Sequence, residues 1–396
     1  MRLPWIALLA CCVGLPVFSQ SGQPVRARQL GVPFDGQPGP LDAITDVAGV
    51  EVGTTTLITG SGPLKVGEGP VRTGVTVVLP RGKSNIDPVY AGWFSLNGNG
   101  EMTGTTWIEE AGLLAGPVGI TNTHSVGTVR DTMIVWGLKH GATGDDWSLP
   151  VVAETFDGFL NDINGFHVKP GHVISALDNA KSGPVPEGNV GGGTGMVCYG
   201  FKGGTGTASR VIGKEMGGYT VGVLVQCNCG RRPQLTIAGV PIGKEIPDGA
   251  PYAQVNTPAP PQGARLPGGE AEGDVGSIII VIATDAPLLP HQLKRIARRA
   301  TLGLARTGST SGNGSGDIFI AFSTANPGAD KAPGPNTVQT VSNSRISPIF
   351  NATVEATEEA IVNAMVAAET MTGRDGHTVN ALPHEQLQQA LKRNGR

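Results

Sequence analysis

The chain has 396 residues and a formal net charge of -3, and 39% of its residues are hydrophobic. It can therefore bury a sizeable core, and this composition excludes a disordered chain or a bundle of membrane helices. With 60 glycines, 30 prolines and few aromatic residues, the chain is expected to form many short strands and tight turns rather than a helical bundle.

The first 20 residues resemble an export signal. Arg2 precedes an apolar segment, Ile6–Val17, and small or polar residues around Ser19 offer a cleavage site. The segment is too short to span a bilayer, so we expect residues 1–20 to be removed and the mature protein to be periplasmic or secreted. The string LLAC ending at Cys11 also resembles a lipoprotein attachment site, but it comes unusually early in the chain, and the cleaved signal is the favoured interpretation.

Short apolar runs and glycine turns alternate through the next part of the chain. Within residues 43–140 the runs GVTVVLP, GPVGITNT and DTMIVWGL each resemble a β-strand. The block GGTGTAS from Gly203 looks like a phosphate loop, but no Gly-Lys-Ser/Thr follows, so we expect its glycines to allow close packing instead. After the strand YTVGVLVQCN comes a loop of about 35 residues that ends at Gly276 and is long enough to be either functional or disordered.

Two strands and two helices are predicted after this loop. The β-branched run Ile278–Ile282 is typical of a buried strand, and Pro290 suits the first turn of a helix that continues to about Arg306. The run DIFIAFST follows as a strand, and residues 353–371 show apolar residues at helical spacing. Because strands and helices occur in both halves, we predict a layered α/β protein.

Several residues that invite a functional interpretation have a structural explanation. His124 and Ser125 suggest a Ser/His/Asp arrangement, but no G-x-S-x-G elbow surrounds any serine, and we expect His124 to be a packed polar residue. Four cations cluster on the first predicted helix of the second half, where we expect a solvated face and no nucleic-acid partner, since the chain is acidic overall. These cations are Lys294, Arg295, Arg298 and Arg299.

Three cysteines remain once the signal is removed: Cys198, Cys227 and Cys229. Their number is odd for an exported protein, and no paired spacing resembles a zinc site. We expect all three to be buried as small hydrophobic residues, and we expect no metal.

The junction Gly276-Ser277 admits two interpretations. One is a turn glycine followed by an ordinary serine at the start of a strand. The other is self-cleavage, because a serine hydroxyl can attack the preceding carbonyl of a strained peptide, and glycine has no side chain to obstruct it. Cleavage would give Ser277 a free α-amine with a pKa of roughly 7.7 to 8.0, which could serve as the general base for its own hydroxyl. Local sequence leaves both interpretations open.

Nine blocks in collinear order resemble one family of enzymes. They include LDAITDVAGVEVGTTTL, TNTHSVGTVRD, VVAETFDGFLNDING, VGVLVQCNCG, GSIIIVIATDAPL and GNGSGDIFIAFST. From about residue 29 to about residue 375 the chain is similar to the self-processing aminopeptidases that include L-aminopeptidase/D-alanine-esterase and the β-peptidyl aminopeptidases. The resemblance implies a four-layer αββα sandwich akin to amino-terminal-nucleophile hydrolases. It also implies cleavage at Gly276-Ser277 into an α-chain, 21–276, and a β-chain, 277–396.

The resemblance implies catalytic roles for four residues. Ser277 matches the family's nucleophile, and Ser315 and Asp317 match residues that orient its amine and hydroxyl. Asn228 matches the asparagine whose side-chain amide helps to form the oxyanion hole, where one donor is worth roughly 3 kcal/mol.

Two further residues concern the substrate. Glu154 matches the carboxylate that receives the free amino group of the substrate. Phe156 is a departure, because some relatives have a tyrosine there, so any hydroxyl contact to the tetrahedral intermediate from this position is missing. This departure puts fine specificity in doubt and leaves the reaction class unchanged.

Taken with the residues, the resemblance implies a serine aminopeptidase that needs no cofactor or metal. It would hydrolyse amides and esters at the amino end of short substrates through an acyl-enzyme on Ser277, as a homo-oligomer of processed units. The preference among α-L, D-alanyl and β-amino acid substrates stays open. Two alternatives are an acetyl-transferring relative of the ornithine acetyltransferases, which typically cut before threonine, and a non-catalytic exported binding protein, which would remain one chain.

Overall fold

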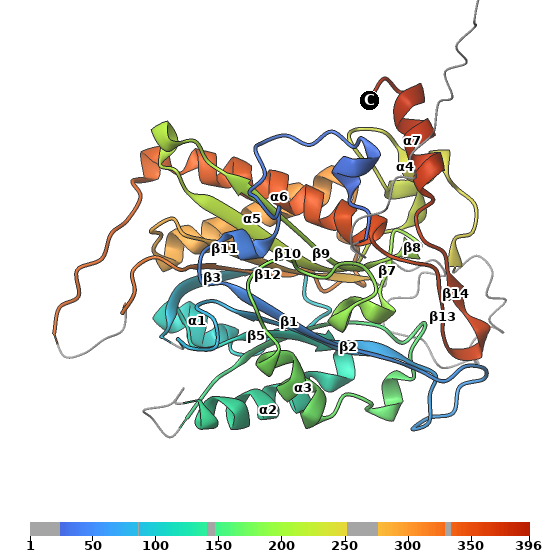
Figure 1. Ribbon diagram of the computed structural model, residues 1–396, viewed down its shortest axis with the longest axis horizontal. Coiled ribbons are helices and arrows are strands. Elements are labelled where there is room, and N and C mark those ends of the chain that lie inside the picture. Colours follow the sequence, from blue (N-terminus) through green and yellow to red (C-terminus); the bar gives the residue numbers. More distant parts are fainter. Residues whose placement is uncertain (1–23, 86, 141–146, 252–275, 329–333) are drawn as a thin grey trace, which may run out of the picture.

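Two β-sheets lie face to face, and helices cover the outer side of each sheet (Figure 1). The structure is a computed structural model, and it describes residues 24–85, 87–140, 147–251, 276–328 and 334–396. The expected signal, residues 1–20, lies outside the described residues. Within those ranges no helix has the length and apolar character needed to cross a bilayer.

The first sheet has four strands in the order β1-β2-β5-β6. β1 and β2 form an antiparallel hairpin, β5 runs antiparallel to β2, and β6 runs parallel to β5. The carboxyl ends of β5 and β6 therefore meet at one edge of the molecule. The bounds are β1 Glu51–Thr59, β2 Val71–Leu79, β5 Val118–Asn122 and β6 Val151–Thr155.

The second sheet has six strands in the order β4-β3-β12-β11-β10-β9. Its two central strands, β12 and β11, are parallel, and every other neighbouring pair is antiparallel. β11 carries the predicted apolar run and is buried along its whole length. The bounds are β3 Val89–Ser95, β4 Leu113–Leu114, β9 Gly204–Val211, β10 Thr220–Asn228, β11 Ser277–Thr284 and β12 Ile318–Ser323.

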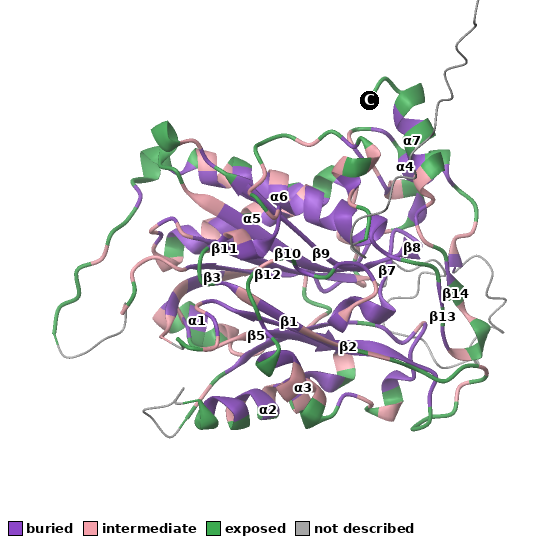
Figure 2. Ribbon diagram, viewed as in Figure 1, coloured by how far each residue is buried: buried purple, intermediate pink, exposed green. Residues whose placement is uncertain are grey.

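Four helices form the outer layers, with α5 and α6 over the six-stranded sheet and α2 and α3 under the four-stranded sheet (Figure 1). Three apolar clusters fill the spaces between successive layers, so the buried residues form continuous bands along both sheets (Figure 2). This arrangement confirms the predicted αββα sandwich. The helices are α2 Val126–Lys139, α3 Pro170–Asp178, α5 Pro290–Arg306 and α6 Ser347–Val366.

Shorter elements decorate this core. A small cluster formed by Leu160, Val197, Met371 and Val379 packs two of the short strand pairs together. The short elements are α1 Thr105–Ala111, α4 Ile242–Glu245, α7 His384–Arg393, β7 Val197–Cys198, β8 Phe201–Lys202, β13 Met371–Thr372 and β14 Thr378–Val379.

The structure confirms most of the predicted elements and corrects two. The helix from Pro290 to Arg306 and the strand DIFIAFST are present as predicted. The run DTMIVWGL is helical and belongs to α2, so its prediction as a β-like run was wrong. The last long helix was placed at 353–371, but it spans Ser347–Val366: Pro348 lies in its first turn and Ile349 is its first buried apolar residue, and both come before the predicted start.

The glycines after Gly203 allow close packing, as predicted. A Cβ atom added at Gly206 would lie 2.1 Å from the carbonyl oxygen of Ala360 and 2.6 Å from the backbone nitrogen of Ala364. Only glycine therefore lets β9 approach the backbone of α6 at this point.

Candidate active site

Ser277 and Asn228 lie opposite each other at one edge of the six-stranded sheet. Ser277 begins β11, Asn228 ends β10, and the antiparallel register pairs the two residues directly. Side chains alternate across a strand, so Ser277 shares a face with Ile279 and Val281, which pack between the two sheets. The hydroxyl therefore opens toward the space between the sheets and not toward the helices.

The turn before β12 holds the hydroxyl and the strand in place. The backbone N–H of Gly316 donates to Ser277 Oγ at 3.1 Å, and the backbone N–H of Ile278 donates to Asp317 Oδ1 at 3.1 Å. Ser315, Gly316 and Asp317 thus lie against the first two residues of β11. The parallel pairing of β11 with β12 causes this contact, because the turn before β12 must lie beside the start of β11.

The side-chain amide of Asn228 has a fixed orientation. Its Oδ1 accepts a hydrogen bond of 2.8 Å from the backbone N–H of Val197. A backbone N–H can only donate, so the carbonyl side of the amide faces Val197, and Nδ2, which carries two N–H donors, lies on the other branch. This geometry leaves donors suited to an oxyanion.

Gly276 precedes Ser277 at a point where only glycine fits. A Cβ atom at this position would lie 2.5 Å from the carbonyl oxygen of Asn228 and 2.7 Å from Cys229 Cα. The backbone at the Gly276-Ser277 bond is therefore pressed against the end of β10. Local sequence had left two interpretations of this glycine open, and the close approach explains the residue under either of them.

Glu154 lies near the carboxyl end of β6, on the opposite sheet, and its side chain is buried. Thr123 Oγ1 donates to Oε2 at 2.5 Å, and the backbone N–H of Glu101 donates to Oε1 at 3.1 Å. Burial raises the pKa of Glu154, while the bonds from Thr123 and Glu101 oppose that rise. An ammonium group brought against this carboxylate would supply the counter-charge that burial withholds.

Two loops bridge the distance between Glu154 and the start of β11. The N–H of Asn99 donates to the carbonyl of Ser315, and Asn99 Nδ2 donates to the carbonyl of Gly314. A Cβ at Gly100 would lie 2.9 Å from Gly316 Cα and 3.3 Å from Glu154 Oε1. Gly316, which binds the Ser277 hydroxyl, is thus separated from Glu154 by one glycine.

Sequence reasoning missed several contributors to this site. Thr123, Asn97 and the loop at Asn99 were not predicted, although Asn97 Oδ1 accepts from the N–H of Asp317 at 2.6 Å. A signal was available for Thr123, because it follows β5 where the parallel strand β6 also ends, and such ends gather at one edge of a sheet.

The other predicted residues have different environments. Ser315 is buried beside Gly316, whereas Phe156 is exposed just beyond β6, with its ring against the backbone of Gly158.

Asp157 is fully buried, its Oδ1 accepts from Asn161 Nδ2 at 3.0 Å, and burial raises its pKa to about 7. It is a second buried carboxyl group three residues after Glu154.

His124 is exposed, so its prediction as a packed polar residue was wrong. Its ring stacks on Phe166 with centroids 5.9 Å apart. The 3-10 turn that follows β5 carries it outward while the neighbouring Ser125 is buried.

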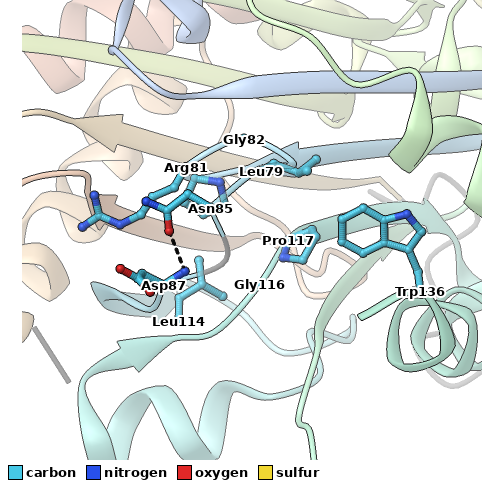
Figure 3. Close-up of a pocket in the computed structure, with 10 residues that line it drawn as sticks. Leu79, Arg81, Gly82, Asn85, Asp87, Leu114, Gly116, Pro117 and Trp136 are labelled. Carbon is cyan, nitrogen blue, oxygen red and sulfur yellow. Dashed lines mark hydrogen bonds between the residues drawn. The ribbon is translucent and has the colours of Figure 1, made fainter. Parts of the chain in front are cut away.

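A small cavity lies at the end of the four-stranded sheet that is away from Glu154 (Figure 3). It is lined by Arg81, Pro117 and Trp136, among others, and its volume of about 10 Å³ holds no more than about one water molecule. Because Pro117 precedes β5 whereas Asn122 ends it, the cavity is at the opposite end of this strand from Glu154 and Thr123.

The three cysteines are buried, as predicted, but they also contact one another. Among the residues that the structure describes, Cys198, Cys227 and Cys229 form the group of three potential ligands able to hold a metal ion. They pack with the helices on the far side of the six-stranded sheet from Ser277.

An αββα sandwich with a buried serine at the start of a central strand suits a hydrolase with an amino-terminal nucleophile, and comparisons with known proteins identify the family. A model described as Peptidase family S58 matches residues 42–379. The chain is 57% identical over 374 residues to the β-peptidyl aminopeptidase BapA of Sphingosinicella microcystinivorans, covering 94% of this chain and 93% of that protein.

Two solved structures are also similar. One is the L-aminopeptidase D-Ala-esterase/amidase from Ochrobactrum anthropi, described as a prototype for the serine aminopeptidases and a variant of the Ntn hydrolase fold. It is 50% identical, with a TM-score of 0.84, and the match covers 94% of this chain and 99% of that one. The other, a Burkholderia sp. β-aminopeptidase, is 46% identical with a TM-score of 0.81 and the same coverage. The chain therefore belongs to peptidase family S58, and it is a hydrolase of the serine aminopeptidase class.

Proposed function

We propose that this chain cuts its own Gly276-Ser277 bond and then removes amino-terminal residues from short peptides, amides and esters, with Ser277 as the nucleophile. One observation carries the proposal. The Ser277 hydroxyl is fixed at the start of a buried strand, and a buried carboxylate, Glu154, lies across two glycine-containing loops from it. The first group suits acyl transfer, and the second suits recognition of an ammonium group.

In the processed enzyme, the free α-amine of Ser277 takes the proton from its own hydroxyl, and Oγ attacks the substrate carbonyl. Asn228 Nδ2 donates to the oxyanion, and its orientation by Val197 means that little reorganisation is needed at that moment. Asp317 already accepts from the N–H of Ile278, so its carboxylate lies near enough to hold the α-amine of the preceding residue. The protonated amine then returns the proton to the leaving group, and water hydrolyses the acyl-enzyme by the same route.

Glu154 receives the substrate's ammonium group in this scheme. The carboxylate is buried, so a substrate with a blocked amino group would leave it desolvated and unpaired. This cost gives the enzyme its preference for a free amino terminus.

Self-cleavage uses the same groups before a free amine exists. The close approach of Gly276 to the end of β10 holds the scissile peptide next to Asn228. Oγ attacks the Gly276 carbonyl, the peptide C–N bond breaks and the Ser277 nitrogen takes the hydroxyl proton, which leaves Gly276 as an ester on Oγ beside a free α-amine. Water then hydrolyses the ester, which releases the Gly276 carboxylate and restores the hydroxyl. Denaturing electrophoresis with amino-terminal sequencing tests this step: two fragments are expected, the smaller one beginning at Ser277. Another start would overturn the choice of nucleophile, and a single full-length band would favour a binding protein.

Among substrates, we propose that peptides beginning with β-amino acids are accepted. The support is the 57% identity to a protein named as a β-peptidyl aminopeptidase, although a relative at 50% identity is named for L-aminopeptidase and D-Ala-esterase activity. A panel of p-nitroanilides of α-L, D and β-amino acids decides between them by kcat/KM. Rates on β-amino acid substrates far below those on both α series would contradict the proposal. Acetyl transfer from acetylornithine, assayed beside this panel, is expected to be absent.

We also propose export and self-association. The apolar segment Ile6–Val17 after Arg2 supports removal of residues 1–20 and a periplasmic or secreted location. The exposed rings of Trp107 and Trp147, whose centroids are 5.3 Å apart, supply an apolar surface for contact with a second copy. Cell fractionation tests the first proposal, and light scattering of the purified protein tests the second, with one processed unit per particle as the contrary result.

A further inference from the structure

Three thiols lie together on the helix-covered face of the six-stranded sheet. Cys198 Sγ is 2.6 Å from Cys227 Sγ and 3.5 Å from Cys229 Sγ, and the last two sulfurs are 3.9 Å apart. All three residues are free cysteines with almost no exposed surface. Buried small hydrophobic residues need no such mutual contact, so the clustering calls for a further explanation.

A buried cation borders these thiols. Lys202 is fully buried, and its Nζ donates to the carbonyls of Gly203 at 2.8 Å and Met196 at 2.9 Å. Within the described ranges no carboxylate forms an ion pair with it. Burial lowers the pKa of Lys202 to about 7, and negative charge on Cys198 and Cys227 opposes that change. Thiolates at Cys198 and Cys227 would favour the ammonium form of Lys202 that burial disfavours.

We propose that Cys198, Cys227 and Cys229 bind a soft divalent ion of the Zn²⁺ and Cd²⁺ type as three thiolates, with Lys202 as the neighbouring counter-charge. Binding releases three protons, and the three thiolates with one divalent ion carry a net charge of -1, which the ammonium group neutralises. Thiolates are the ligands that select such ions.

The distances suit this assignment. At a Zn–S distance of about 2.3 Å, three sulfurs around one ion in a plane lie about 4 Å apart. The separations of 3.5 and 3.9 Å between the sulfur of Cys229 and the other two are close to this value. Only the pair Cys198 and Cys227 has to separate when the ion enters.

The ion would lie behind the proposed oxyanion hole rather than in it. Asn228 stands between Cys227 and Cys229 in the chain, and its Oδ1 accepts from Val197, the neighbour of Cys198. Cys227 faces the opposite side of β10 from Asn228, and all three cysteines belong to the apolar cluster on the helix-covered side of the sheet, away from Ser277. The ion therefore holds the backbone that positions Asn228 and does not touch the substrate; this last step rests on the proposed function, but the metal site itself does not.

Metal content provides the test. The full chain is produced in zinc-supplemented medium, dialysed against a chelator at neutral pH and analysed by mass spectrometry for metals. About one ion per chain is expected, since the buried site exchanges slowly. The metal content of Cys229→Ser is expected to be lower than that of the wild type by about fivefold or more. Lys202→Met is also expected to lose metal. Ile237→Val is the control, because it removes one methylene from the same core and no thiol. Protein produced with Cd²⁺ should show thiolate-to-metal charge-transfer absorption.

Two results would overturn the proposal. Metal-free wild-type protein in which Cys198, Cys227 and Cys229 are all free thiols after unfolding would mean that the cysteines only fill space. Metal-free protein in which only one of the three is a free thiol, with a mass lower by two hydrogens, would mean that the other two form a disulfide. Both results are measured on the wild-type protein, so they remain valid even if a variant does not fold. Retained metal in a protein without aminopeptidase activity would contradict the proposed function alone.

Discussion

The two sheets contribute different things to the candidate site. The six-stranded sheet carries Ser277, Asn228 and Asp317 at the meeting of β10, β11 and β12, and these groups suit bond making and breaking. The four-stranded sheet carries Glu154 at the end of β6, with Thr123 after β5, and these groups suit recognition of a charge. Chemistry and recognition therefore lie on separate rigid supports and should be separable by mutation.

The largest effect is expected from Ser277→Ala. Without the hydroxyl the chain should remain in one piece, and aminopeptidase activity should fall by about 10⁴-fold or more. Electrophoresis and a p-nitroanilide assay measure both. Ser323→Ala removes another buried serine, at the far end of β12, and should still be cut. A processed Ser277→Ala protein would show that the chemistry belongs to another residue.

The next effect concerns Asn228→Ala. Loss of one oxyanion donor should lower kcat by about 10² to 10³-fold, roughly 2.7 to 4 kcal/mol, with little change in KM, and should slow processing as well. The matched control is Asn363→Ala, which removes a buried amide that binds Ala27 and Thr207, and which should cost stability but not kcat. A rise in KM with an unchanged kcat would move Asn228 to the recognition side of the comparison.

Glu154→Gln should break recognition while sparing chemistry. Removing the charge should lower kcat/KM by roughly 1.5 to 3 kcal/mol, about ten- to two-hundred-fold, for a free-amine ester and hardly at all for its N-acetylated form. Processing should survive, because the Gly276-Ser277 peptide presents no free amine.

Glu101→Gln is the control for this variant, since it removes an exposed charge from the residue whose backbone binds Glu154. If Glu154→Gln keeps the full preference for a free amine, Asp157 and Asp317 become the carboxylates to examine.

Thr123→Val should give the smallest effect and sharpen the comparison through pH. The α-amine of Ser277 must be neutral to take the hydroxyl proton, so it sets the first acid limb of the kcat/KM profile. Glu154 must also be ionised to bind an ammonium group, so the profile becomes steeper as pH drops through the pKa of Glu154. The Thr123 hydroxyl opposes the rise in that pKa, so its removal should raise the pKa of Glu154 and move this second, steeper limb of the profile to higher pH. Thr121→Val, which removes a hydroxyl bound to Gly74 instead, should leave the limb in place. If this limb of the pH profile does not move in Thr123→Val, the group that titrates there is not Glu154.

The sequence predicted correctly those elements that are specified by residues close together in the chain. β11 and α5 were predictable because an unbroken apolar run and a proline at the first turn are local signals. The helical character of DTMIVWGL was not predictable, because the run also contains the apolar residues Val135 and Leu138, which α2 leaves exposed, so its apolar residues do not mark the buried face.

The site divides in the same way. The residues named from the resemblance at the ends of β10 and β11 come together as expected, since neighbouring strands place them there. The contact of Thr123 with Glu154 and the clustering of Cys198 with Cys227 join segments that are 31 and 29 residues apart. Spacing along the chain carries no signal for such contacts, because their geometry depends on how the sheets and loops pack.

The strand order has a consequence for the life of the protein after processing. Cutting at Gly276-Ser277 would assign β11 and β12 to one fragment and the strands on either side of them, β10 and β3, to the other. Each fragment would then hold the other by backbone hydrogen bonds along two long borders, so the pieces could not drift apart without dismantling the sheet. Folding would be unimolecular only once, in the precursor. Any later recovery from denaturation would have to reunite two separate polypeptides, at a rate that depends on their concentration.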